Sequence, residues 1–368
     1  MKIYLCSLLL LLGITTNAQF SVRLIVTDVA TRKNDDIYVS GNFNNWNPRD
    51  EKYKLKPFGG SRKAIVMKDM PAGTYAFKFS RGDAAKLEST ADGRDVADRV
   101  LEVTEDASKE FVIPGWKDDY PEKPKRYTAS PQVKVIDTAF RIPQLNRTRR
   151  IWVYLPKGYT GISKIYPVLY MQDGQELFND QAATASEWGV DECLDTLQSR
   201  LGKECIVVAI DNGGDKRSSE YDPYKEGKQY ADFLATTLKP YIDSKYRTKK
   251  GAEATFITGS GLGGVISLYT LFQYPFVFGT AVTLSAPFST TPAIYADAEK
   301  FQTPGSPRIY LYTGGREATP TSADLLKMAE ILGKKPLIEI RKVTSPLGQL
   351  NEKTWGQEFA DMYRWLLR

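Results

Sequence analysis

Two hydrophobic periodicities divide the chain. Between Phe20 and Ile113, short segments alternate apolar and polar residues, with Gly, Asn, Asp and Pro between them. Short alternating segments separated by turn residues predict β-strands packed as a sandwich. The clearest predicted strands are Ser21–Val26, Ile37–Val39, Tyr75–Phe79 and Val100–Val103.

From about Val133 onward, short apolar segments alternate with longer amphipathic ones. Several of the short segments are apolar on both faces, which is typical of parallel strands covered by helices. This part of the chain therefore predicts an α/β domain with a mainly parallel sheet. Expected strands are 151–155, 167–171, 205–210, 255–258, 308–312 and 337–340, and expected helices are 186–201, 228–246, 262–273, 322–333 and 353–367.

Two further segments have the composition of non-globular regions. Residues 114–132 contain four prolines and many charges but almost no aliphatic side chains, which predicts a linker. Residues 1–18 place Lys2 before a short apolar run that ends at the small residue Ala18, as in a cleavable signal peptide. The run is too short to cross a bilayer as a helix.

We therefore expect a multi-domain protein: a signal peptide over 1–18, a β-sandwich over 19–113, a linker over 114–132 and an α/β domain over 133–368. Such a protein is expected to be secreted or periplasmic, with no integral membrane segment after cleavage of the signal.

The composition of the chain excludes several classes of partner and of enzyme. The 368 residues include 50 Lys and Arg against 44 Asp and Glu, a net charge of +6 without a long basic run, so a nucleic-acid partner is not indicated. The chain contains no histidine. This excludes the Ser-His-Asp hydrolases, the His-assisted cysteine hydrolases and most zinc enzymes. We expect neither a metal nor a cofactor.

The segment Tyr38–Pro48, which reads Tyr-Val-Ser-Gly-Asn-Phe-Asn-Asn-Trp-Asn-Pro, resembles the signature of starch- and glycogen-binding modules. The resemblance implies an immunoglobulin-like fold and a sugar stacked on aromatic faces, with Trp46 as the candidate. Family members commonly carry a second aromatic residue in the stretch equivalent to 83–88, which has none here. We therefore favour a structural domain that braces its neighbour over a glucan-binding one.

Residues 133–368 resemble the esterase family of α/β-hydrolases that includes enterochelin esterases and feruloyl esterase modules. The resemblance rests on segments such as Tyr166–Gln175, Ile210–Gly214, Glu220–Pro223 and Phe256–Gly264. It implies ester hydrolysis by a serine on a Gly-x-Ser-x-Gly turn, assisted by an acid and a histidine base.

The residues at the matching positions differ from that pattern. The turn reads Gly259-Ser-Gly-Leu-Gly263, so Gly261 stands at the nucleophile position. The base position holds Leu350 and the acid position Glu317. Leu262 and Gln172 match the oxyanion-hole region, and Gln172 stands where family members often carry His. Without a base to orient, we expect a structural role for Glu317.

Three hypotheses follow. The first is an exported, non-catalytic esterase-like protein that binds a glycan or an envelope protein through the remnant cleft. The second is a carbohydrate or siderophore-type carboxylic ester hydrolase whose nucleophile is Ser260 or Ser285, assisted by Lys or a carboxylate. The third is a structural subunit of an envelope assembly. Exposed aromatic residues in the cleft would favour the first over the third, and the candidates are Trp188, Tyr221, Tyr224 and Phe288.

Overall fold

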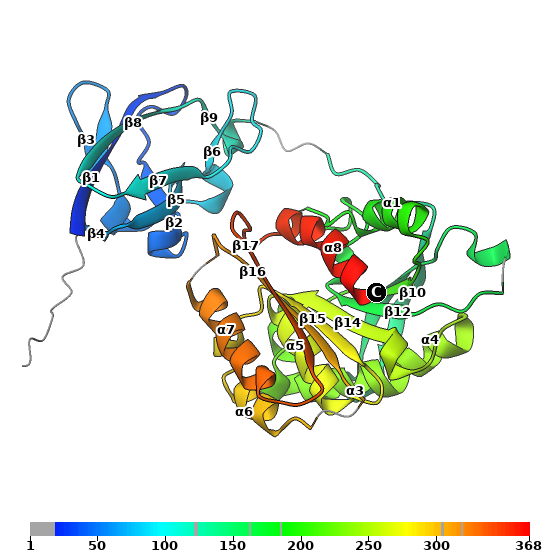
Figure 1. The fold of residues 1–368 in the computed structure, drawn as a ribbon. Coiled ribbons are helices and arrows are strands. Elements are labelled where there is room, and N and C mark those ends of the chain that lie inside the picture. Colours follow the sequence, from blue (N-terminus) through cyan, green and yellow to red (C-terminus); the bar gives the residue numbers. More distant parts are fainter. Residues whose placement is uncertain (1–18, 121–123, 162, 185, 303–304, 318) are drawn as a thin grey trace, which may run out of the picture. The chain divides into compact units, whose positions relative to one another are not determined.

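The computed structural model describes residues 19–120, 124–161, 163–184, 186–302, 305–317 and 319–368 (Figure 1). The chain forms two compact units, which meet in sequence between residues 123 and 124. The predicted signal peptide lies outside the described residues. Within the described ranges, no helix is both long enough and apolar enough to cross a membrane.

The first unit is a β domain with two main sheets. Side chains from both sheets, including Leu24, Val39, Phe77 and Val103, share one buried core. This region is consistent with a separate β domain, and its immunoglobulin-like class stays a prediction. One sheet has the order β3 (Lys56–Pro57), β4 (Lys63–Pro71), β1 (Gln19–Val29) and β8 (Ala107–Ile113), the other β2 (Tyr38–Gly41), β5 (Gly73–Ser80) and β7 (Arg99–Val103), and a short pair joins β6 (Glu88–Ser89) to β9 (Gly115–Trp116).

The first unit extends past the predicted boundary at residue 113. Strand β9 pairs antiparallel with β6, and Trp116 is fully buried in the β core. The indole N–H of Trp116 donates to the carbonyl of Thr31 at 3.2 Å, and the Arg81 guanidinium lies 5.3 Å from the ring centroid. The amino-terminal part of the expected linker therefore belongs to the β domain.

The carboxyl-terminal part of the expected linker, residues 124–132, packs on the second unit. The N–H of Gln181 donates to the carbonyl of Arg126 at 3.1 Å. The N–H of Ser130 donates to the carboxylate of Asp191 at 2.6 Å. Composition predicted a linker here because these contacts use the backbone, which leaves no trace in the pattern of side chains.

The second unit contains one eight-stranded sheet. The first two pairings, β10 with β11 and β11 with β13, are antiparallel, and all later neighbours are parallel. The mainly parallel sheet is therefore confirmed. Its order is β10 (Val133–Ile142), β11 (Arg147–Tyr154), β13 (Ile206–Ile210), β12 (Val168–Gln172), β14 (Thr255–Ser260), β15 (Thr280–Leu284), β16 (Arg308–Gly314) and β17 (Glu339–Ser345).

Helices cover both faces of this sheet (Figure 1). Leu268 of α5 and Met328 of α7 belong to one core, and Leu194 of α1 and Phe359 of α8 to the other. Two buried faces explain why β12 to β15 are buried along their whole length. The helices are α1 (Val190–Leu201), α2 (Arg217–Glu220), α3 (Lys228–Asp232), α4 (Lys239–Lys245), α5 (Leu262–Gln273), α6 (Ala293–Lys300), α7 (Thr319–Gly333) and α8 (Glu352–Leu366).

The contact between Ser130 and Asp191 makes stability depend on pH. Asp191 is completely buried, and burial raises its pKa from 3.8 to about 7. The folded state therefore holds this proton more tightly than the unfolded state, and stability falls as the pH rises from about 4 to about 7. Asp191→Asn keeps an oxygen for the Ser130 N–H and removes the charge.

We expect Asp191→Asn to melt a few degrees above the wild type at about pH 8, with the difference closing as the pH falls toward about 4. Thermal melts across this range measure it, and Asp361→Asn, on an exposed carboxylate, is the control. A stabilisation of equal size at every pH would contradict the explanation.

Candidate active site

The centre of the site is the sharp turn between β14 and α5. Gly261 has φ +54° and ψ −126°, a conformation that glycine adopts without a steric penalty. Its N–H donates to the carbonyl of Leu284 at 2.8 Å, which fixes the turn to the neighbouring strand β15. A Cβ on Gly259 would lie 2.5 Å from the backbone of Gly263, so only glycine permits this close crossing. The predicted strand-turn-helix is therefore present.

The turn has room for a side chain that it does not carry. Apart from Gly261 itself and its two chain neighbours, no heavy atom of the described residues is found within 4 Å of the position that a Cβ on Gly261 would take. Ser260, one position earlier, is the last residue of β14 and only 5% exposed. The space for a nucleophilic side chain at position 261 is therefore open, and the hydroxyl of Ser260 is buried at the end of the strand.

The acid position, Glu317, follows β16 and is buried. Its carboxylate accepts the N–H of Gly314 at 2.7 Å and the hydroxyls of Ser285 and Thr313 at 2.5 and 3.2 Å. Burial raises the pKa of Glu317, and these three donors oppose that rise. Trp355 of α8 donates its indole N–H to Ser285 at 2.9 Å. Glu317 thus fastens the ends of β15 and β16 to α8.

The base position, Leu350, lies in the loop between β17 and α8 and is 59% exposed. Because β14, β16 and β17 are parallel, the loops that hold Gly261, Glu317 and Leu350 all leave the same edge of the sheet. The topology thus brings the three predicted positions to one edge, where they hold a glycine, a glutamate and a leucine.

The two predicted oxyanion-hole residues differ in their availability. The amide of Leu262 is the first of α5, where backbone N–H groups have no partner inside the helix. Gln172 ends β12 and is buried, and its side-chain oxygen accepts the hydroxyl of Tyr230 at 2.7 Å. Its amide nitrogen has no partner among the described residues. The backbone of Leu262 is therefore the better preserved donor.

Sequence reasoning assigned no role to a polar cluster that supports the turn. Asp173, next to Gln172, accepts two hydrogen bonds from Arg217 at 2.7 and 2.9 Å and one from Asn212 at 2.7 Å. Arg217 also reaches the carbonyl of Ser260 at 3.4 Å. The cluster joins the loops after β12 and β13 to the turn after β14. The sequence places Asp173 just after a predicted strand and next to Gln172. This position was the signal that could have identified the cluster.

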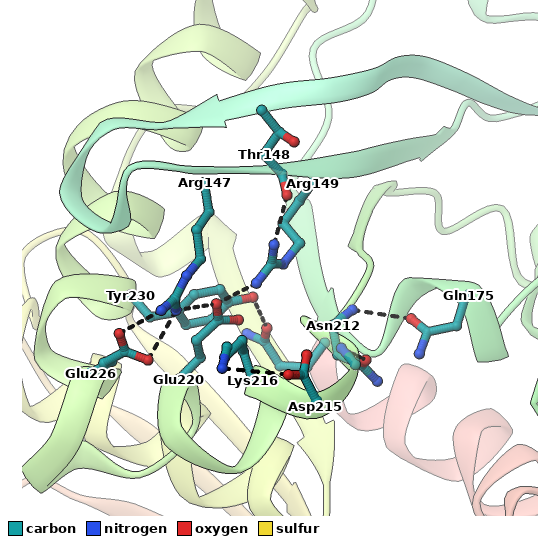
Figure 2. Close-up of polar contacts among 12 residues, drawn as sticks. Arg147, Thr148, Arg149, Gln175, Asn212, Asp215, Lys216, Glu220, Glu226 and Tyr230 are labelled. Carbon is teal, nitrogen blue, oxygen red and sulfur yellow. Dashed lines mark hydrogen bonds and ion pairs between the residues drawn. The ribbon is translucent and has the colours of Figure 1, made fainter.

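A second ionic network lies beside this cluster, and Figure 2 shows it. Glu220 is fully buried and accepts hydrogen bonds from Arg147, at 2.7 Å, and from Arg149. Arg147 also binds both oxygens of Glu226, at 2.9 and 2.7 Å. A Cβ on Gly213 would lie 2.5 Å from Glu220. The network fixes β11 to α2, which carries Arg217 at its start.

The aromatic candidates are mostly core residues. Trp188, Tyr221 and Phe288 are at most 6% exposed, whereas Tyr224 is 47% exposed. Trp46 lies in a turn of the first unit, and its backbone φ is +57°. Among the described residues, no group of three or more metal-ligating side chains is arranged to hold an ion.

Comparisons with known proteins agree with this geometry. Among solved structures, the enterobactin esterase FES of Shigella flexneri is 17% identical with a TM-score of 0.55, over 90% of this chain and 88% of its own. A ferulic acid esterase is 20% identical with a TM-score of 0.52, over 64% of this chain and 98% of its own. At such identities the similarity concerns the fold.

Sequence comparisons identify the family as well as the fold. The uncharacterized protein YbbA of Bacillus subtilis (strain 168) is 26% identical over 200 residues, which are 49% of this chain and 74% of YbbA. A family model with the description "Putative esterase" matches residues 142–366. Because that match spans more than half of the chain, this protein belongs to the Putative esterase family, with an esterase-like α/β-hydrolase domain.

Proposed function

We propose that this protein is a non-catalytic member of its esterase family that binds a glycan or an envelope protein at the carboxyl edge of its sheet. The observation that carries the proposal is Gly261 at the centre of the turn, in a chain without histidine. A serine hydroxyl is a weak nucleophile until a base removes its proton. Here both partners of that step are absent from their positions.

The remaining polar groups at this edge support binding. The first amide of α5, at Leu262, offers a donor to a carbonyl or hydroxyl oxygen of a ligand. Gly261 leaves free the volume that a serine would fill. Arg217 and Asp173 keep the loops in place without taking part in any chemistry. The edge is therefore preorganised for a ligand that it does not cleave.

A carboxylic ester hydrolase with an unorthodox site is the second candidate. The family itself and the structural neighbours, named as enterobactin and ferulic acid esterases, favour it. It requires another nucleophile. Ser285 is 1% exposed, and its hydroxyl is shared between Glu317 and Trp355. Ser260 is buried at the end of β14. Neither hydroxyl meets an entering substrate without a rearrangement of the loops.

The third hypothesis is a structural subunit of an envelope assembly. The burial of Trp188, Tyr221 and Phe288 favours it over the first, because exposed aromatic residues were expected at a binding cleft. It shares with the first the absence of hydrolysis, and it differs in predicting no ligand at the carboxyl edge. The activity assay below therefore separates both of them from the second candidate.

Purified protein should not hydrolyse aryl acetate, methyl ferulate or a catecholate triester above the rate of a heat-treated sample. Without the nucleophile and the base, the oxyanion donors provide only a small residue of a triad's rate enhancement. Continuous assays at several substrate concentrations measure this. Saturable turnover that a Ser285→Ala variant abolishes would establish the second candidate in place of the first.

Introducing a serine at position 261 and a histidine at position 350 is a second test of the proposal. Gly261→Ser should fold, because space for the side chain exists, but should lose about 1–3 kcal/mol of stability to backbone strain. It should show no activity, because Leu350 is not a base. Gly261→Ser with Leu350→His should gain weak esterase activity if Glu317 exchanges Ser285 for the new imidazole.

Gly158→Ser is the matched control, since Gly158 also has a positive φ, +78°, and open space around its Cβ position. It should lose stability in the same way and gain nothing from Leu350→His. Activity in Gly261→Ser alone would mean that another base serves the turn, and the proposal would then be wrong.

A further inference from the structure

A groove of about 660 Å³ lies away from the turn and is lined by residues from the carboxyl end of α5 and from α6. Figure 1 labels both helices. Helix α5 begins at the turn and has 12 residues, so its far end lies about 18 Å from Gly261. The groove is therefore separate from the candidate active site, and what it binds does not depend on the function proposed above. Its volume is in the range of small-molecule sites, about 300–1,000 Å³.

One largely exposed aromatic ring lines this groove. Phe276, in the loop after α5, is 82% exposed. It lines both this groove and a neighbouring hollow of about 440 Å³, so ligands reach its ring from two sides. Tyr224 is 47% exposed, and its hydroxyl donates to Asp297 of the groove at 2.5 Å. Phe276 is thus the accessible ring that lines the groove, and Tyr224 contacts the groove only through its hydroxyl bond to Asp297.

The floor of the groove is rigid. Phe272 of α5 and Phe301, just after α6, are at most 8% exposed, and their ring centroids are 4.8 Å apart. Their contact joins the end of α5 to the segment that follows α6. A binding surface on such a packed floor loses little conformational freedom when a ligand arrives.

The rim of the groove is polar and electrically balanced. It offers two amides, one carboxylate and one ammonium group, from Gln273, Gln302, Asp297 and Lys300. These groups both donate and accept hydrogen bonds. One negative and one positive charge give no net attraction to a polyanion or a polycation.

We infer that this groove is a binding site for a neutral saccharide. The C–H faces of a pyranose ring are apolar and pack against the flat face of Phe276. Its hydroxyls require both acceptors and donors at the rim, which the carboxylate of Asp297 and the amides of Gln273 and Gln302 provide. A lipid or an apolar peptide would leave these polar groups without partners, at a cost in free energy.

Affinity electrophoresis of the full protein tests this inference. The gels contain arabinoxylan, glycogen or mixed-linkage β-glucan as neutral polymers, and polygalacturonate as the charged one. We expect at least one neutral polymer to retard the wild type. Phe276→Leu keeps an apolar side chain but loses the flat ring, and should weaken that retardation about tenfold. Phe276→Trp should preserve it.

Two control variants locate the effect. Leu326→Ala removes a side chain that is 61% exposed on α7, and should change nothing. Trp46→Ala separates any sugar site in the first unit, and the retardation that depends on Phe276 should survive it. Since Phe276 is largely exposed, its variants should melt with the wild type.

Three results would overturn the inference. The first is retardation by every polymer that is equal in the wild type and in Phe276→Leu, including no retardation at all. The second is dependence on Phe276 with polygalacturonate alone. The third is a wild-type dimer in light scattering that Phe276→Leu converts to a monomer, which would assign this surface to a second copy of the chain.

Discussion

The turn at Gly261 is the constraint on which the carboxyl edge of the sheet depends. Strand β14 ends at Ser260 and helix α5 begins at Leu262, so the chain reverses direction at a single residue, Gly261, with φ +54°. The bond from the Gly261 N–H to Leu284 and the close crossing of Gly259 over Gly263 fix that reversal. The backbone geometry of this turn then sets the position of the Leu262 amide and leaves open space at the Cβ position of Gly261.

Around this turn, the supporting contacts form with glycine at position 261. Arg217 binds Asp173, and Glu317 uses its carboxylate to join Ser285, Thr313 and the backbone of Gly314. Buried charges of this kind are costly when one partner is removed. This gives a physical reason for the frame of the site to persist when its reactive side chains do not. In an active relative the strain at the turn serves chemistry, and here glycine removes it.

The sequence predicted those features of the fold that depend on residues close together in the chain. The resemblance of Phe256–Gly264 to the esterase family predicted the turn, and the change of period near Val133 predicted the mainly parallel sheet. Contacts between distant residues left no such pattern: Arg147 with Glu220, or Ser130 with Asp191, pair only after folding. Strand β15 escaped prediction because Thr280 and Thr283 interrupt its apolar run, although both side chains are buried.

The central claim is that an esterase-type turn is intact here but carries no activated nucleophile. Intact-mass measurement after incubation with a fluorophosphonate tests it directly, because the reagent reacts covalently only with an activated hydroxyl. We expect the wild type to keep its mass, even at an excess of reagent that labels a serine esterase completely. One phosphonyl group per chain, at Ser260, Ser285 or any other serine, would contradict the claim and show that this protein is an enzyme.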